Sequence, residues 1–333
     1  STDTIANQAA GGAWASGGNL NNGVVGNCGF GTYTAAVSVG GYRSTGTTAA
    51  VEHYDGSSWT TATSIPAATD NVGSCGIRTA GLIYGGQRPP NTNATFEYDG
   101  TNWTSGGNLN TARRTIVGAG TQTAALAALG AIDPPFTAEA EQYNGSSWTT
   151  VAEANTARRS AAGGGTSTSA LAYGGYLGPP GYSAATESWD GSSWTSVADI
   201  NAVRGIMGGG GTSNTDQLTF GGYGGPPGSQ RYTNTQAWDG TSWTEVADLS
   251  LARSTSNSLP SAPTANQLFA GGHTPPANYT TITEEWSAPS TFTKQIEGQL
   301  FFNSTANAFK ETITDIPGAS WASGGNLNTT RAA

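Results

Sequence analysis

Histidine, cysteine and clustered acidic side chains most often carry catalysis or bind metals, and this chain offers few of them in useful arrangements. Its two histidines, His53 and His273, lie far apart in the sequence. No His, Cys, Asp or Glu cluster has the spacing of a metal site, and no serine, histidine and aspartate can be assigned to a hydrolytic triad. The glycine run at 208–211 lacks the lysine of a phosphate-binding loop and suits a close-packed strand. We therefore expect a protein that is not an enzyme and has no cofactor and no metal.

Side chains suited to binding recur instead in the loops that follow a double glycine. Five of these loops contain Pro-Pro, as in "QRPPNTN" (87–93) and "YLGPPGYS" (176–183), and a sixth reads "YRSTGTT" (42–48). Rigid loops that present aromatic rings beside hydrogen-bond donors suit contact with a glycan or a protein surface. The alternative is that Pro-Pro only keeps long loops ordered. The candidate binding residues are Tyr42, Arg43, Arg88, Phe136, Tyr176, Tyr182, Tyr223, Arg231, Tyr232, His273 and Tyr279.

The composition favours short strands joined by tight turns. Among 333 residues there are 49 glycines, and charged residues make up only 11%. The formal net charge is −9 without a basic stripe, which argues against nucleic-acid binding. No apolar run approaches the length of a membrane span, so we expect no membrane insertion. The chain begins at Ser1 without a visible signal peptide, and we expect it to be processed or to be part of a longer protein.

These loops belong to a repeat that covers most of the chain. "YDGSSWT" at 54–60 returns with small changes at 98–104, 143–149, 189–195 and 238–244. The tryptophans recur about every 45 residues, which is the spacing of propeller blades. They are Trp14, Trp59, Trp103, Trp148, Trp194 and Trp243. Asp-Gly or Asn-Gly between two short strands indicates a hairpin turn, whose aromatic residues we expect to pack between adjacent blades.

Four repeats end in a short linker that contains arginine: "LNTARR" (109–114), "ANTARR" (154–159), "INAVR" (200–204) and "LSLAR" (249–253). Because the linkers recur at the junction between blades, we expect their arginines to donate hydrogen bonds to carbonyl groups there. They are Arg113, Arg114, Arg158, Arg159, Arg204 and Arg253.

A double glycine after an apolar strand, then tyrosine, tryptophan and arginine, resembles the kelch repeat of β-propellers over residues 19–292. The repeat sequence, with "SSWT…VA…NTARR" followed by "SALAYGG", is similar to kelch-like repeats in structural proteins of marine tailed bacteriophages. The Asp box of sialidase propellers is a partial rival, but the aspartate here directly precedes the glycine, so the match is incomplete. The resemblance implies an all-β fold and a virion-associated role.

Six strand pairs that end in glycine, five of them in a double glycine, predict a six-bladed propeller of four-stranded antiparallel blades over residues 1–294, with seven blades as the alternative. Because the last repeat lacks its "DGxxW" motif, we expect residues 12–17 around Trp14 to complete that blade. "WASGGNLN" occurs at 14–21 and again at 321–328. We therefore expect residues 295–333 to be a C-terminal β extension containing a hairpin, able to mediate homo-oligomer contacts.

The cysteines Cys28 and Cys75 each precede a glycine at the start of an inner strand in neighbouring blades. They form either a disulfide near the axis or two small buried thiols.

The sequence thus predicts a non-enzymatic structural or adhesion protein located in a virion or outside the cell. Its expected partners are other virion subunits or a host-surface glycan or protein. The alternative is a secreted propeller enzyme or lectin that acts on carbohydrates.

Overall fold

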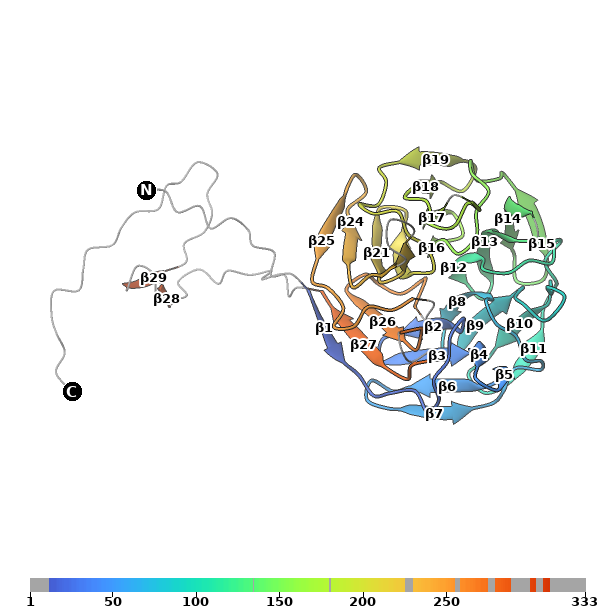
Figure 1. The fold of residues 1–333 in the computed structure, drawn as a ribbon, viewed down its shortest axis with the longest axis horizontal. Helices are drawn as coiled ribbons and strands as arrows, with labels where there is room; N and C mark the ends of the chain where they lie inside the picture. Colours follow the sequence, from blue (N-terminus) through green and yellow to red (C-terminus); the bar gives the residue numbers. More distant parts are fainter. Residues whose placement is uncertain are drawn as a thin grey trace. The chain divides into compact units, whose positions relative to one another are not determined.

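The computed structural model describes residues 12–133, 135–179, 181–224, 230–254, 258–274 and 279–288, together with the backbone of 300–303 and 308–311. The chain divides into two compact units, residues 1–289 and 290–333. In the larger unit, six antiparallel sheets surround a common centre as the blades of a propeller (Figure 1). Six blades were expected, and the seven-blade alternative is wrong. The described part of the chain holds no helix of the length and hydrophobicity needed to cross a membrane.

The first three blades are four-stranded, and each runs in chain order from the centre to the rim. Blade one contains β2 (Cys28–Thr32), β3 (Ala35–Val39), β6 (Val51–Tyr54) and β7 (Trp59–Ala62). Blade two contains β8 (Gly73–Ile77), β9 (Ala80–Tyr84), β10 (Thr95–Tyr98) and β11 (Trp103–Ser105). Blade three contains β12 (Val117–Thr121), β13 (Ala124–Ala131), β14 (Phe136–Tyr143) and β15 (Trp148–Val151).

The remaining blades continue this order, and the last one uses both ends of the unit. Blade four contains β16 (Ala162–Thr166), β17 (Ser169–Tyr173), β18 (Thr186–Trp189) and β19 (Trp194–Val197). Blade five contains β20 (Gly208–Ser213), β21 (Asp216–Phe220), β24 (Thr235–Trp238) and β25 (Trp243–Val246). Blade six contains β26 (Asn266–Ala270), β27 (Thr283–Ser287) and, as its outermost strand, β1 (Ala13–Ser16).

The repeated "DGxxW" motif forms the hairpin between the third and fourth strands, as predicted. In blade one, Asp55 Oδ1 accepts hydrogen bonds from the backbone N–H groups of Ser57 and Ser58, both at 2.8 Å. Gly56 has φ of +93°, a conformation that glycine adopts without steric cost. Tyr54 and Trp59 then pair across the hairpin with ring centroids 4.9 Å apart. Local turn chemistry therefore sets the register of the outer strands.

The tryptophans of these hairpins also join neighbouring blades. Trp148 Nε1 of blade three donates to Thr95 Oγ1 of blade two at 3.0 Å. Trp59 Nε1 of blade one donates to Thr283 Oγ1 of blade six at the same distance. Each ring thus buries its apolar area between two sheets while its N–H finds a partner. The expected packing of these aromatic residues between blades is confirmed.

The ring is closed by the N-terminal strand, as expected from the missing motif in the last repeat. Trp14 of β1 pairs with Trp286 of β27 in antiparallel register. Its Nε1 donates to Thr235 Oγ1 of blade five at 2.9 Å. Trp14 therefore takes the place in blade six that Trp59 takes in blade one. Closure by a distant strand covers the edge that blade six would otherwise expose.

Glycine allows the inner strands to meet near the axis. A Cβ atom on Gly164 of β16 would lie 1.9 Å from the Pro260 carbonyl oxygen, and one on Gly210 of β20 would lie 2.2 Å from that of Leu259. The same carbonyl of Pro260 accepts hydrogen bonds from the backbone N–H groups of Gly165 and Gly211. The run at 208–211 is therefore a close-packed strand, as predicted.

The two cysteines form no disulfide, so the disulfide alternative is wrong. Cys28 and Cys75 are both buried free thiols, and burial raises the pKa of Cys28 to about 12.

The smaller unit contains a two-stranded antiparallel hairpin of β28 (Leu300–Asn303) and β29 (Ala308–Glu311), where the sequence indicated one. The second copy of "WASGGNLN", at 321–328, lies outside the described residues.

Candidate binding surface

One face of the propeller is formed by the loops between the second and third strands and by the linkers between blades. We call it the loop face. Each linker holds the first residue of its loop through backbone hydrogen bonds. Tyr176 N donates to the Arg159 carbonyl at 2.7 Å, and Tyr223 N donates to that of Gly205 at 2.8 Å. The scaffold thus fixes where these side chains begin, and the loops vary from that point.

Four aromatic rings on this face form a continuous row across blades three, four and five. Phe136 lies 5.8 Å from Tyr176, Tyr176 lies 5.1 Å from Tyr182, and Tyr182 lies 5.6 Å from Tyr223, measured between ring centroids. All four side chains are partly exposed. These residues come from three separate repeats, and the tertiary structure brings them into one row.

Two arginines flank the row. The Arg159 guanidinium lies over the rings of Phe136 and Tyr176, 5.2 and 5.1 Å from their centroids. The short hairpin of β22 (Tyr223–Gly224) and β23 (Gln230–Arg231) places the Arg231 guanidinium 5.4 Å from the Tyr223 centroid. We call these six residues the aromatic–arginine strip: Phe136, Arg159, Tyr176, Tyr182, Tyr223 and Arg231.

The charges at the strip act on its central ring. The pKa of Tyr182 is raised, first by burial and then by Tyr223 and Tyr176, while Arg159 and Arg231 lower it. Both guanidinium groups are therefore close enough to influence the middle of the row. Among the described residues, neither Arg159 nor Arg231 forms an ion pair.

Arg159 was missed as a binding residue because linker arginines were expected to be structural. Its neighbour Arg158 fits that expectation, since it is fully buried and donates from Nε to the Gly174 carbonyl at 2.8 Å. Arg159 instead points to the loop face. The available signal was the doubled arginine in "NTARR" (155–159), because adjacent residues in an extended segment point in opposite directions.

The buried linker arginines have carboxylate partners that the sequence reasoning also missed. Arg158 pairs with Glu187 of β18, and Arg113 pairs with Glu141 of β14. In blade six, Arg253 Nη1 lies 2.5 Å from Glu284 Oε2. The expected hydrogen bonds to carbonyl groups are present for Arg113, Arg158, Arg204 and Arg253. The same prediction was wrong for Arg114, which pairs with Asp133, and for Arg159, which lies over two aromatic rings.

Two expected binding residues, Arg43 and Arg88, have intramolecular partners. Arg43 lies 3.6 Å from Glu52, and the Arg88 guanidinium lies 5.7 Å from the ring centroid of Phe96. Blades one and two have Val24 and Thr69 where later blades have a buried linker arginine. Arg43 and Arg88 thus supply from the loop the cation that other blades supply from the linker.

The remaining expected residues lie apart from the strip. Tyr42 is 43% exposed and lies 6.3 Å from Tyr279, measured between ring centroids. Tyr232 lies over the buried Arg204, 5.7 Å from its guanidinium, and belongs to the packing of blade five. The backbone of His273 pairs with Ser254 in the adjoining linker.

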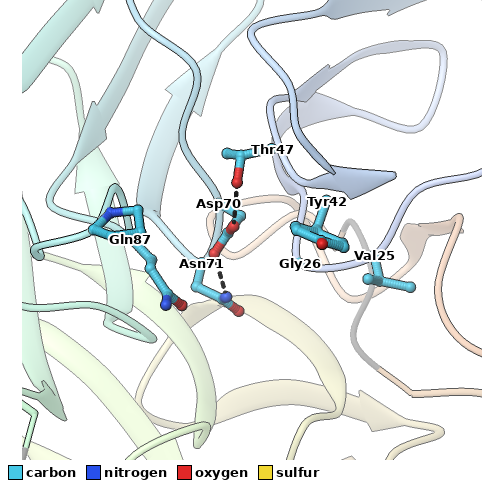
Figure 2. A pocket seen from close by; sticks show the side chains of 8 residues that line it. Val25, Gly26, Tyr42, Thr47, Asp70, Asn71 and Gln87 are labelled. Atoms are coloured by element: carbon cyan, nitrogen blue, oxygen red, sulfur yellow. Dashed lines mark hydrogen bonds between the residues drawn. The ribbon is translucent and has the colours of Figure 1, made fainter. Parts of the chain in front are cut away.

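A hollow of about 310 Å³ lies between blades one and two on the same face (Figure 2). Within it, the Asp70 carboxylate accepts hydrogen bonds from Thr47 Oγ1 at 3.2 Å and Asn71 Nδ2 at 2.6 Å. Burial raises the pKa of Asp70. The residues that line the hollow are Val25, Gly26, Tyr42, Thr47, Asp70, Asn71, Gln87 and Pro89. A second hollow of about 340 Å³ includes Arg43 and Tyr279 in its lining.

The described residues contain no group of three or more His, Cys, Asp or Glu side chains that could hold a metal ion.

No protein-family model and no curated protein matches the chain. The solved "Structure of YjhT" is similar in fold, with a TM-score of 0.68 and 15% sequence identity. The similarity covers 82% of this chain and 97% of that one. At this identity the similarity extends to the fold alone.

Proposed function

We propose that this protein is a non-enzymatic structural or adhesion protein of a bacteriophage virion, and that it binds a glycan or protein surface through its loop face. The aromatic–arginine strip carries the proposal. The resemblance of the repeat sequences to kelch-like repeats of phage structural proteins supports the virion assignment. A location in a virion or outside the cell follows from that assignment. Its partners would be other virion subunits or molecules of the host surface.

The two faces of the propeller differ in whether their side chains are bonded within their own turns or remain available for a ligand. On the opposite face, the turn aspartates accept hydrogen bonds from their own turns, as Asp190 does from the N–H groups of Ser192 and Ser193. These turns repeat with little change from blade to blade. On the loop face, Phe136, Tyr176 and Tyr182 leave ring surface exposed and come from loops of different sequence. Variable loops on a constant scaffold are where recognition usually occurs.

Aromatic rings in a row suit a chain of sugar units, because each ring can cover the apolar face of a pyranose while hydroxyl groups and guanidinium N–H groups exchange hydrogen bonds. Single contacts of this kind are weak. Many copies on one particle would raise the apparent affinity, because the later contacts become intramolecular.

The test is a variant in which Tyr176, Tyr182 and Tyr223 are all replaced by alanine. We expect attachment to host cells, or docking to the partner subunit, to fall at least tenfold, while the circular dichroism spectrum stays that of the parent. The matched control is Tyr33→Ala, which removes a partly exposed tyrosine from the opposite face. Equal binding by the triple variant and the parent would refute the proposal, and detection of the chain in purified virions would support the virion assignment directly.

The proposal also includes a role in oligomer formation for the C-terminal residues. We assign residues 295–333 to contacts with a neighbouring copy of this chain. Removal of these residues should lower the oligomeric mass measured by light scattering and leave the melting of the propeller unchanged.

A secreted enzyme or lectin that acts on carbohydrates is the second candidate. The hollow at Asp70 favours it, because a carboxylate of raised pKa beside a tyrosine is a group that general acid catalysis uses. Hydrolysis of any member of a glycan panel, abolished by Asp70→Asn, would establish this candidate.

A further inference from the structure

The strip holds positive charge that the protein itself does not neutralise. Five arginines of the described residues form ion pairs: Arg43, Arg113, Arg114, Arg158 and Arg253. Arg159 and Arg231 do not, although the chain carries a formal net charge of −9. Arginine stays charged under all ordinary conditions. Two cations thus remain uncompensated beside one row of rings in an acidic protein.

These cations are also partly removed from water. The Nε atoms of both Arg159 and Arg231 are shielded from solvent and have no hydrogen-bond partner among the described residues. Burial lowers the pKa of Arg231. A partly desolvated guanidinium is costly when it stands alone, and an anion that reaches its terminal Nη groups forms a charge-assisted hydrogen bond. Stacking on Phe136, Tyr176 and Tyr223 holds the guanidinium planes in place, so little side-chain entropy is lost when an anion binds.

The order of groups along the strip is cation, rings, cation. Arg159 lies over Phe136 and Tyr176 at one end, Tyr182 occupies the middle, and Arg231 lies over Tyr223 at the other end. A ligand that fits this order carries negative groups at intervals along a body with apolar faces. A saccharide chain bearing carboxylates or sulfates has this pattern, because its ring faces are apolar and its acidic substituents project from the ring edges.

We infer that the aromatic–arginine strip binds an acidic polysaccharide, with Arg159 and Arg231 each donating hydrogen bonds to one carboxylate or sulfate group. The inference rests on the proposed function, because it names the class of ligand for the same surface. The rest of the protein repels a polyanion, so binding depends on these two groups and weakens as salt screens them.

The experiment measures binding of the full chain to three immobilised polymers of similar size: alginate, which carries carboxylates, dextran sulfate, and uncharged dextran. We expect binding to at least one acidic polymer and no measurable binding to dextran. Arg159→Gln and Arg231→Gln should each weaken binding about tenfold, which corresponds to one charge-assisted contact. The double variant should lose about a hundredfold. The two acidic polymers distinguish carboxylate from sulfate as the preferred group.

The matched control is Arg78→Gln, which removes one positive charge from the opposite face, where Arg78 Nη1 donates to the Tyr54 carbonyl. It changes the net charge as each strip variant does and should leave binding unchanged. Equal losses in all three single variants would show that only net charge matters and would overturn the inference.

The outcome also separates this inference from the proposed function. If the triple tyrosine variant loses host or subunit binding while the double arginine variant keeps it, the loop face is the contact surface and its ligand is not acidic. Failure of both acidic polymers to bind the parent chain, or binding of dextran with equal strength, would overturn the inference in the same way.

Discussion

Blades four and five show two ways of burying an arginine at the same position of the repeat. In blade four, Arg158 pairs with Glu187, and the other carboxylate oxygen, Oε2, accepts the backbone N–H of Asn155. In blade five, Arg204 is equally buried, but the residue opposite is Gln236. The Gln236 amide donates to Glu245 at 2.7 Å, so the negative charge lies one strand further out.

The consequence in blade five is an arginine with fewer partners. Arg204 Nη1 donates to the carbonyls of Gly221 at 2.9 Å and Asn234 at 3.0 Å. Its Nε and Nη2 atoms have no hydrogen-bond partner in the part of the chain that the structure describes. The backbone of a blade therefore keeps its geometry without the ion pair. The pair in blade four therefore stabilises a fold that hydrophobic packing and the hairpin turns already specify.

The largest expected effect comes from removing the arginine of blade four. Arg158→Met leaves Glu187 buried without a cation and should lower the free energy of unfolding by about 3–5 kcal/mol. The same change in blade five, Arg204→Met, leaves no carboxylate buried alone and should cost about 1 kcal/mol or less. Urea unfolding followed by tryptophan fluorescence measures both. Similar losses in the two variants would mean that the carboxylate is not what distinguishes the blades.

A smaller effect is expected from giving blade five the residues of blade four. Gln236→Glu combined with Glu245→Ser reproduces the pattern of Glu187 and Ser196. The new carboxylate reaches Arg204, and removal of Glu245 avoids two like charges side by side. We expect a gain of about 1–2 kcal/mol, the scale of a hydrogen bond to a charged group. The single variant Gln236→Glu serves as the control and should gain less, because Glu245 then opposes it. A destabilised double variant would show that blade five has been optimised around the amide.

The smallest effect concerns the outer turns, where blades four and five agree. The pKa of Asp190 is lowered by hydrogen bonds from the side chain of Ser192 and the backbone of Ser193, and those from Thr241 and Ser242 lower that of Asp239 to about 2. A carboxyl group whose pKa is lower in the folded state stabilises the fold above its unfolded pKa of about 4, and this contribution is lost as the pH falls toward 2. Asp190→Asn with Asp239→Asn should therefore flatten the decline of the melting temperature between pH 4 and pH 2. Asn144 of blade three already makes the same turn contacts, so the fold tolerates the change. An identical decline in variant and parent would contradict the assignment.

The blades also differ in what the arginines on the loop face contact. Blades three to five present cations and rings, whereas blades one and two direct Arg43 and Arg88 to their own Glu52 and Phe96. The arginines that the early blades lack in their linkers are replaced from their loops, and this use removes them from the binding surface. An arginine that contacts a residue of its own blade is thus not available to bind a ligand.

Several features of the fold could be predicted because they depend on residues close together in sequence. The turn at Asp55 and Gly56, repeated with small changes in the first five blades, sets the hairpins, and the regular spacing sets the number of blades. Trp14, which precedes the first complete repeat, indicated that the N-terminal strand closes the ring. The loop face could be predicted as well, since alternate connections of an antiparallel blade emerge on the same side.

By itself, then, the sequence determined the repeat, the turns, the closure and the face on which the variable loops lie, because each follows from local geometry applied many times. Only the tertiary structure decided which side chains meet. Arg158 and Glu187 are 29 residues apart, and Phe136, Tyr182 and Arg231 come from three different blades. The doubled arginine of "NTARR" indicates that two adjacent side chains point in opposite directions. Which carboxylate or ring each of them meets depends on strands and loops that are distant in the sequence, so no short stretch of sequence contains it.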